Sequence, residues 1–100
     1  MKRIIAILTK KGALCDDLQK NTDVNIFKME GGRVVEYENI KLADNAYQSF
    51  SLILTSKKIS LIYMNHVGEE LKKIAKKAGC VFKSREDFGD DEFIKQFVFS

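Results

Sequence analysis

The sequence contains no proline, no tryptophan and a single histidine, and its 100 residues include six glycines and two cysteines. Because no stretch is rich enough in glycine or proline to act as a flexible linker, we expect one globular domain spanning residues 1–100. Cys15 and Cys80 have neither the spacing of a metal motif nor the density of a disulfide framework. This cysteine usage favours a reducing compartment.

Long apolar segments are also missing. No apolar run approaches the roughly 20 residues that span a bilayer, so we expect no membrane partner. The basic N-terminus is followed by an apolar stretch of only Ile4–Leu8, which is too short for a secretory signal peptide and lacks a small-residue cleavage site. The default expectation is therefore a cytoplasmic protein.

The formal net charge is +3, and lysines are interspersed with aspartate and glutamate along the chain. This balance is too mild and too mixed to predict a nucleic-acid partner. The sequence also has no Gly-x-Ser-x-Gly element, no phosphate-binding loop motif and no cluster of His and Cys residues. We therefore expect a protein that binds rather than an enzyme.

The most regular stretch, Ile59–Phe82, predicts one strand–helix–strand unit. Its first apolar run, Ile59–Met64, is typical of a strand that is covered on both faces. From Val67 the apolar residues follow a helical period, with acidic residues in the first turn, lysines in the last, and Gly79 at the left-handed cap position. A second apolar run, 80–82, then predicts a strand parallel to the first.

The other segments predict the neighbours that this unit needs. Continuous apolarity predicts a central strand near the N-terminus, and two β-rich runs around Gly31-Gly32 predict a hairpin at a sheet edge. The predicted elements are a strand at Arg3–Thr9, a loop at Ala13–Asp23, hairpin strands at Val24–Glu30 and Arg33–Ile40, a helix at Leu42–Ser56 and a last helix from Asp90. Their order predicts an α/β three-layer sandwich, with a mixed five-stranded sheet and helices on both faces.

Ligands of open α/β sheets bind outside the carboxyl ends of the parallel strands. Two loops are expected there, one following the N-terminal strand and one following Ile59–Met64. The first loop carries lysines, and the second leads into a helix whose free N–H groups attract anions. At Gly68 a side chain would crowd a ligand at the helix start. The residues expected to line this anion-binding crevice are Lys10, Lys11, Gly12, Lys20, Val67 and Gly68.

Several side chains near the predicted crevice allow two interpretations. His66 is either a metal or cluster ligand, or a solvated turn residue. Cys15 is either a thiolate ligand activated by the neighbouring lysines, or a plain surface thiol. Asp16 and Asp17 are either a general base or metal pair, or solvated loop carboxylates. Cys80 opens an apolar strand and is expected to be buried packing.

Three segments carry a resemblance to a known family. They are the opening strand KRIIAILT, the hairpin VNIFKMEGGRVVEYENI, and ISLIYMNHVGEELKKIAKKAGCVF, which keeps a Val-Gly turn before the helix and Ala-Gly at its end. Together they resemble the dinitrogenase iron–molybdenum cofactor biosynthesis family, the NifX/NafY-type domain, over most of the chain. The resemblance implies a ribonuclease-H-like fold. The first loop departs from the pattern, because Cys15–Asn21 lacks the histidine and glycine of the family's Ser-x-His-Phe-Gly-Arg-Ala-like segment.

Members of this family are small carriers or chaperones of iron–molybdenum or related metal–sulfur clusters. The resemblance implies a non-enzymatic carrier that holds such a cluster, or a related anion, at the carboxyl ends of the central parallel strands. Cys15 and His66 are the candidate cluster ligands. The altered first loop favours an alternative, in which a degenerate member without a cluster acts as a protein–protein interaction or regulatory module through its edge hairpin.

Overall fold

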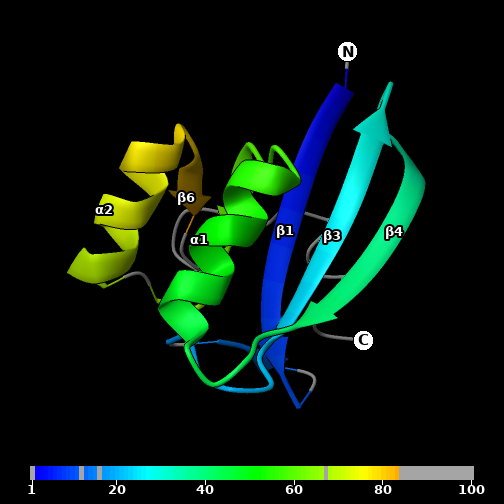
Figure 1. Cartoon of the computed structure of the whole chain (residues 1–100). Helices are drawn as coiled ribbons and strands as arrows, with labels where there is room; N and C mark the ends of the chain where they lie inside the picture. The colour runs from blue at the N-terminus through cyan, green and yellow to red at the C-terminus, as the bar shows by residue number, and fades with distance from the viewer. Residues whose placement is uncertain (1, 12, 16, 67, 84–100) are drawn as a thin grey trace.

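The computed structural model describes residues 2–11, 13–15, 17–66 and 68–83, and Figure 1 shows their arrangement. Strands and helices alternate along the second half of these residues, as the α/β class requires. The strands are β1 (Lys2–Lys10), β2 (Ala13–Leu14), β3 (Asp23–Glu30), β4 (Arg33–Lys41), β5 (Leu61–Tyr63) and β6 (Val81–Lys83), and the helices are α1 (Ala46–Ser56) and α2 (Glu69–Ala78). The predicted α/β class is confirmed.

The sheet is mixed, with the strand order β4–β3–β1–β5–β6 and with β2 attached to β1. β3 is antiparallel to both of its neighbours, whereas β5 is parallel to β1 and β6 is parallel to β5. β1 is therefore the central strand, as its continuous apolarity predicts. The predicted parallel pairing of the two strands in Ile59–Phe82 is confirmed.

The segment Ala13–Asp23 is not wholly a loop, so this prediction is wrong in part. β2 pairs with the end of β1, with Thr9 opposite Leu14 and Lys10 opposite Ala13. The chain reverses at Lys11, which has a positive φ of 55°. A two-residue strand is too short to show any sequence period, and it makes the sheet six-stranded among the described residues instead of five-stranded.

The predicted hairpin is confirmed. Gly31 and Gly32 have φ values of 59° and 79°, as a primed two-residue turn requires, and Glu30 lies opposite Arg33. β4 comes last in the strand order and lies at the edge, as predicted. The pairing shifts by one residue between Lys28 and Met29, which marks a β-bulge in this hairpin.

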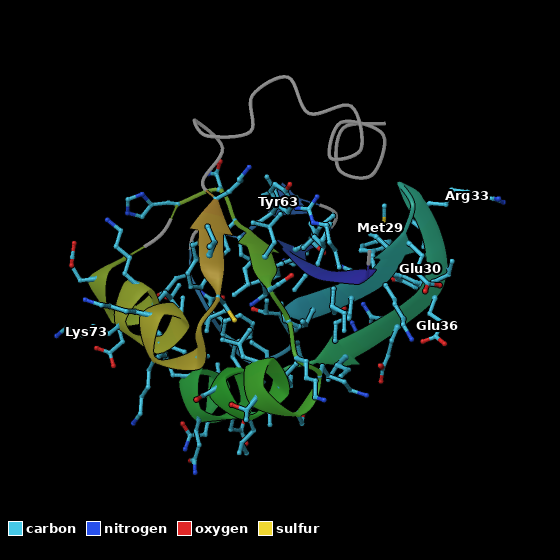
Figure 2. All side chains as sticks on the ribbon, turned by 90° about the horizontal axis from the view of Figure 1, so that it is seen from above. Met29, Glu30, Arg33, Glu36, Tyr63 and Lys73 are labelled. Atoms are coloured by element: carbon cyan, nitrogen blue, oxygen red, sulfur yellow. The ribbon has the colours of Figure 1, made fainter. Side chains whose placement is uncertain are left out.

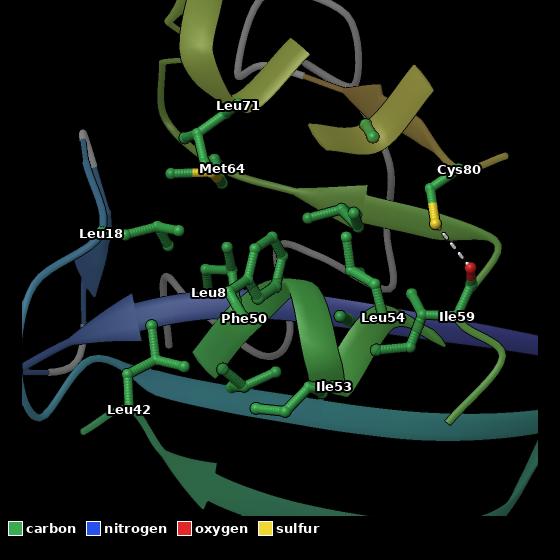
Figure 3. Packing of buried hydrophobic residues seen from close by; sticks show 14 of the residues in the cluster. Leu8, Leu18, Leu42, Phe50, Ile53, Leu54, Ile59, Met64, Leu71 and Cys80 are labelled. Atoms are coloured by element: carbon green, nitrogen blue, oxygen red, sulfur yellow. Dashed lines mark hydrogen bonds between the residues drawn. The ribbon is translucent and has the colours of Figure 1, made fainter. Parts of the chain in front are cut away.

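Both described helices pack on one face of the sheet (Figures 1 and 2). Phe50 of α1 is fully buried there, and Figure 3 shows it between the strands and the neighbouring apolar side chains. The buried cluster on this face contains Ala6, Leu8, Cys15, Leu18, Val24, Ile26, Leu42, Ala46, Phe50, Ile53, Leu54, Ile59, Ile62, Met64, Leu71, Ala75 and Cys80. The helical periods of α1 and α2 therefore supply the apolar stripes that bury this sheet face.

The predicted start of the first helix at Leu42 is wrong, because α1 begins at Ala46. Leu42 instead continues the extended path of β4: its N–H donates to the backbone oxygen of Thr22 at 3.0 Å, and Asn21 N–H donates to the Leu42 oxygen at 2.9 Å. Its side chain is nonetheless buried in the core. Leu42 therefore has the spacing of a helix residue, but it reaches the core from an extension of strand β4.

The opposite face of the sheet holds a second buried cluster, which contains Ile5, Ile7, Leu14, Phe27, Leu61 and Tyr63. The predicted last helix from Asp90 lies outside the described residues. The expectation that helices cover both faces, and with it the three-layer arrangement, stays a prediction.

A buried polar network on this second face joins β1, β3 and β4. The side chain of Asn25 is 4% exposed, and its Nδ2 donates to the backbone oxygen of Ile7 and to Thr9 Oγ1, both at 3.0 Å. Its Oδ1 accepts from Tyr37 OH and from Asn39 Nδ2, both at 2.9 Å. All four hydrogen-bonding positions of the amide are used, so Asn25 fixes the alignment of three strands without an unsatisfied polar atom.

The helix α2 matches its sequence prediction closely. Gly68 is its N-cap, and acidic residues occupy its first turn and lysines its last turn. Gly79 adopts the left-handed conformation with φ of 75°, and its N–H donates back into the last turn of the helix. In the described part of the chain, no helix is both long enough and apolar enough to cross a membrane.

Candidate functional site

The loop after β1 brings three of the predicted site residues together. Lys10, Lys11 and Cys15 line one cavity of about 420 Å³. The left-handed turn at Lys11 and the short strand β2 fold the loop back on β1, which places residues from both arms around this space. The described residues that line it are Lys10, Lys11, Leu14, Cys15, Asp17 and Gln19.

The two lysines of the cavity differ in their surroundings. Lys10 Nζ donates to Gln19 Oε1 at 2.6 Å and to the backbone oxygen of Lys20 at 3.4 Å. These acceptors are neutral, so they hold the ammonium in place without cancelling its charge. Lys11 is exposed on the turn. The cavity thus has one fixed and one exposed cation.

Lys20, which we expected in the same site, does not line the cavity. Its ammonium instead contacts Asp44 Oδ1 at 3.0 Å, between two exposed side chains. Gly12 and Val67 lie outside the described residues.

Cys15 is a core residue, and the interpretation of it as a surface thiol is wrong. It is 5% exposed and belongs to the apolar cluster under α1 and α2. Its N–H donates to the backbone oxygen of Leu8 at 3.0 Å, which continues the pairing of β2 with β1. Leu18, three residues on, is buried in the same cluster and closes the loop over it.

One backbone hydrogen bond joins the two predicted loops. The N–H of Asn65, directly after β5, donates to the backbone oxygen of Cys15 at 2.9 Å. The loops at the carboxyl ends of β1 and β5 are therefore adjacent, as the topology predicts. The second loop continues through His66 to Gly68, where α2 begins.

His66 and Gly68 show no feature that fixes a ligand. His66 is exposed, which agrees with the solvated-turn interpretation. Gly68 has φ of −79°, which any residue adopts, and a β-carbon built there meets no atom within 4 Å. The chain itself therefore gives no steric reason for glycine at this position. Among the described residues, no three His, Cys, Asp or Glu side chains are grouped to hold a metal ion.

No pattern in the sequence predicts the interaction between Tyr47 of α1 and the first loop. Tyr47 OH donates a hydrogen bond to Asp17 Oδ1, which also accepts from the N–H of Leu18 at 2.8 Å. The bond to Asp17, burial, and the charges of Asp17 and Glu70 raise the pKa of Tyr47 to about 12. Asp17 therefore anchors the loop to α1, which is neither of the two roles that its sequence suggested. Asp16 lies outside the described residues.

Cys80 behaves as predicted. It is buried, its Sγ donates to the backbone oxygen of Ile59 at 2.8 Å, and Figure 3 shows this contact beside Leu54. Burial raises the pKa of its thiol. Cys15 and Cys80 form no disulfide with each other, and Cys80 has a packing role.

Comparison of the chain with protein-family models, with curated proteins and with solved structures finds no match.

Proposed function

We propose that this chain is a small non-enzymatic binding or carrier protein, which takes up an anion at the carboxyl ends of β1 and β5. One observation carries the proposal: Lys10, Lys11 and Cys15 line one cavity, although they come from both arms of a reversing loop. The bond from Asn65 N–H to the Cys15 oxygen holds the second loop beside it.

The charge of the cavity suits an anion. Among the described residues of the lining, Lys10 and Lys11 contribute two positive charges and Asp17 contributes one negative charge. The Asp17 carboxylate is already engaged by Tyr47 OH and by a backbone N–H, so part of its charge is compensated inside the chain. The loop that contains Asn65 is held beside the cavity and leads to Gly68, the N-cap of α2. The N-terminus of a helix attracts anions.

We propose an anionic metal–sulfur cluster, of the iron–molybdenum or a related kind, or an oxyanion, as the cargo. The resemblance to the NifX/NafY-type family supports the cluster, and β3 as the single antiparallel strand of the long sheet path supports the proposed ribonuclease-H-like, three-layer fold. The side chains do not fit a ligation site, because Cys15 is buried in the core and His66 is exposed. Binding would therefore depend on charge and backbone N–H groups, not on ligation by Cys15 and His66.

The first experiment is anaerobic purification followed by metal and acid-labile sulfide analysis with an absorption spectrum. It is repeated after incubation with iron, molybdate and sulfide. Stoichiometric metal with visible absorption supports the cluster. Uptake of molybdate alone, measured by equilibrium dialysis, supports an oxyanion.

Variants then test whether the lysine cavity is the site. Lys11→Gln removes one exposed positive charge of the lining, and Lys73→Gln on the exposed face of α2 is its matched control. A charge within about 4 Å of an anion contributes on the order of 1 kcal/mol in water, so Lys11→Gln should weaken binding roughly fivefold at low salt. The control should leave it unchanged, and raising the salt concentration should erase the difference. Equal effects of the two variants would place the anion elsewhere.

The exposed edge strand β4 favours a second candidate function, a protein–protein interaction module without a cluster. A protein that stays colourless and takes up neither metal nor molybdate would support this alternative over the carrier.

A further inference from the structure

The outer edge of β4 presents a long strand that no described strand covers. β4 is nine residues long, and among the described strands it pairs only with β3. Three of its large apolar side chains are exposed: Val34 by 45%, Val35 by 48% and Tyr37 by 54%. A long edge strand with exposed apolar residues is a template for pairing with another strand.

The β-bulge decides which side chains of β4 share a face. Val34 lies opposite Met29 and Tyr37 lies opposite Phe27, with Val35 as the extra residue. Phe27 and Met29 are two residues apart on β3, so they point to the same face, and so do Val34 and Tyr37. The Phe27 and Tyr37 rings are in contact there, with centroids 5.0 Å apart.

Arg33, Glu36 and Glu38 lie on the other face of β4, whereas Lys41 at its end lies opposite Asp23, on the face of Tyr37. Arg33 is opposite Glu30, Glu36 is opposite Lys28, and Glu38 is opposite Ile26. Figure 2 shows the side chains of Arg33 and Glu36 on the β4 side of the molecule, directed away from the sheet. Between Arg33 and Glu38, β4 thus presents the apolar side chains Val34 and Tyr37 on one face, and one cation and two anions on the other.

We propose that two copies of this chain pair antiparallel through β4, with Arg33 opposite Glu38 of the second copy. In this alignment Val34 lies opposite Tyr37 of the second copy, and the two-fold axis repeats both pairs. Residues opposite each other across antiparallel strands share a face, and both pairs meet that condition. If Val35 is left out of this pairing in both copies, as it is in the pairing with β3, Glu36 meets the same residue of the second copy at the axis.

Charge selects this alignment over one neighbouring alignment, and the length of the paired segment selects it over the other. Sliding the second copy one residue pair toward the end of β4 places Glu36 opposite Glu38 twice and takes Arg33 away from the carboxylates of the second copy, so it adds repulsion and loses attraction. Sliding it the other way places Arg33 opposite Glu36 of the second copy twice, but it pairs only the residues next to the Gly31-Gly32 turn and shortens the interface. At the axis of the proposed alignment, Lys28 lies beside Glu36 in each sheet and offsets the one like-charge contact.

The dimer does not depend on the proposed anion site. β4 runs parallel to β1, because both are antiparallel to β3. The two-fold axis therefore directs the two cavities lined by Lys10 and Lys11 to opposite ends of the assembly. Failure of anion binding and failure of dimerisation are separate results.

Sedimentation equilibrium from about 20 µM to about 1 mM tests the proposal, since one strand pair is a small interface and predicts weak association. The wild-type chain should show a monomer–dimer equilibrium. R33E and E38R should each weaken dimerisation about fivefold or more, because each change replaces two attractive pairs across the interface by two repulsive ones. E38R also removes the ion pair of Glu38 with Lys57 Nζ, at 3.0 Å within each copy, so R33E is the cleaner of the two changes. The double variant R33E/E38R restores opposite charges and should return the dissociation constant to near the wild-type value.

Two further variants sharpen the test. E36Q removes the like-charge contact at the axis and should tighten the dimer, an effect that no general loss of charge or fold predicts. K73E makes the same charge change as R33E on α2, which Figure 2 shows on the opposite side of the molecule, and should have no effect. A monomer at every concentration, or a dimer indifferent to R33E and E38R, would overturn the proposal, as would a double variant that fails to recover.

Disulfide trapping checks the alignment directly. A mixture of V34C and Y37C proteins should form a mixed disulfide under mild oxidation, because directly opposite residues bring their β-carbons within reach of a disulfide. V34C alone should crosslink far less. The native thiols Cys15 and Cys80 are buried and should not compete. Efficient crosslinking of V34C to itself would exclude this alignment.

Discussion

Replacing Asn25 by alanine should destabilise the protein more than any exposed change on the same strands. The variant removes two buried hydrogen bonds, one to the backbone oxygen of Ile7 and one to Thr9 Oγ1. Both acceptors are buried, so water cannot replace the lost donor. It also removes the acceptor of Tyr37 and Asn39, but both side chains are exposed and can bond to solvent instead. At about 1 kcal/mol for each buried bond plus the cost of an unsatisfied group, we expect a loss of about 2–4 kcal/mol.

Urea unfolding followed by circular dichroism measures this loss, since the midpoint falls while the slope stays constant if the native fold is kept. Tyr37→Phe is the matched variant, because it deletes only the bond from the hydroxyl to Asn25 and should cost about 1 kcal/mol or less. The double variant should cost less than the sum of the two, since Asn25→Ala has already removed the partner of the hydroxyl. A loss below about 0.5 kcal/mol for Asn25→Ala, or additivity of the two changes, would show that the Asn25 hydrogen bonds do not stabilise the sheet.

Three further changes test other parts of the structure. Phe50→Ala leaves a cavity in the fully buried core and should lower the free energy of unfolding by about 3–5 kcal/mol in a urea titration. The bond to Asp17 raises the pKa of Tyr47 to about 12, so folding gains stability below pH 10 that is lost as the pH rises through 12. Asp17→Asn should move the tyrosinate absorbance titration of Tyr47 back towards 10, and an unchanged titration would exclude the bond as the cause. Gly79→Ala should cost about 1 kcal/mol in thermal unfolding, because the position has a positive φ of 75° and its space is otherwise open.

The sequence predicted well those elements whose apolar residues follow a clear period and whose ends are marked by glycine or charged residues. The Ile59–Phe82 unit has an apolar run, a helical period and Gly79 at the cap, and all three appear in the structure. The Gly31-Gly32 turn is defined by two residues that accept positive φ. Each of these signals arises within a few neighbouring residues, so the sequence alone carries it.

The errors concern positions whose environment is made by distant parts of the chain. Leu42 has the spacing of a helix residue, but its backbone pairs with Thr22 across the sheet. Cys15 sits among polar neighbours in the sequence, yet the core cluster under α1 and α2 encloses it. No local pattern distinguishes these outcomes, because burial depends on which elements fold over the residue.

The candidate site was predicted in outline only. Topology correctly brought the loops after β1 and β5 together, and Lys10, Lys11 and Cys15 do line one cavity. Lys20 lies elsewhere because its long side chain reaches Asp44 instead. The contact of Tyr47 with Asp17 was not foreseeable, since it joins residues that are 30 positions apart through one rotamer of each side chain.

The strand order also has a consequence for the time at which the sheet is assembled. β1 finds its antiparallel neighbour within residues 2–30, and β3 finds β4 across a two-residue turn, so half of the sheet is made of local pairs. The other edge of β1 pairs with Leu61–Tyr63, and this requires closure of a much longer loop. During synthesis, the apolar central strand therefore carries an open edge until β5 has left the ribosome. While this edge is open, the nascent chain can pair with a wrong partner. The length of the segment between β4 and β5 determines how long this interval lasts.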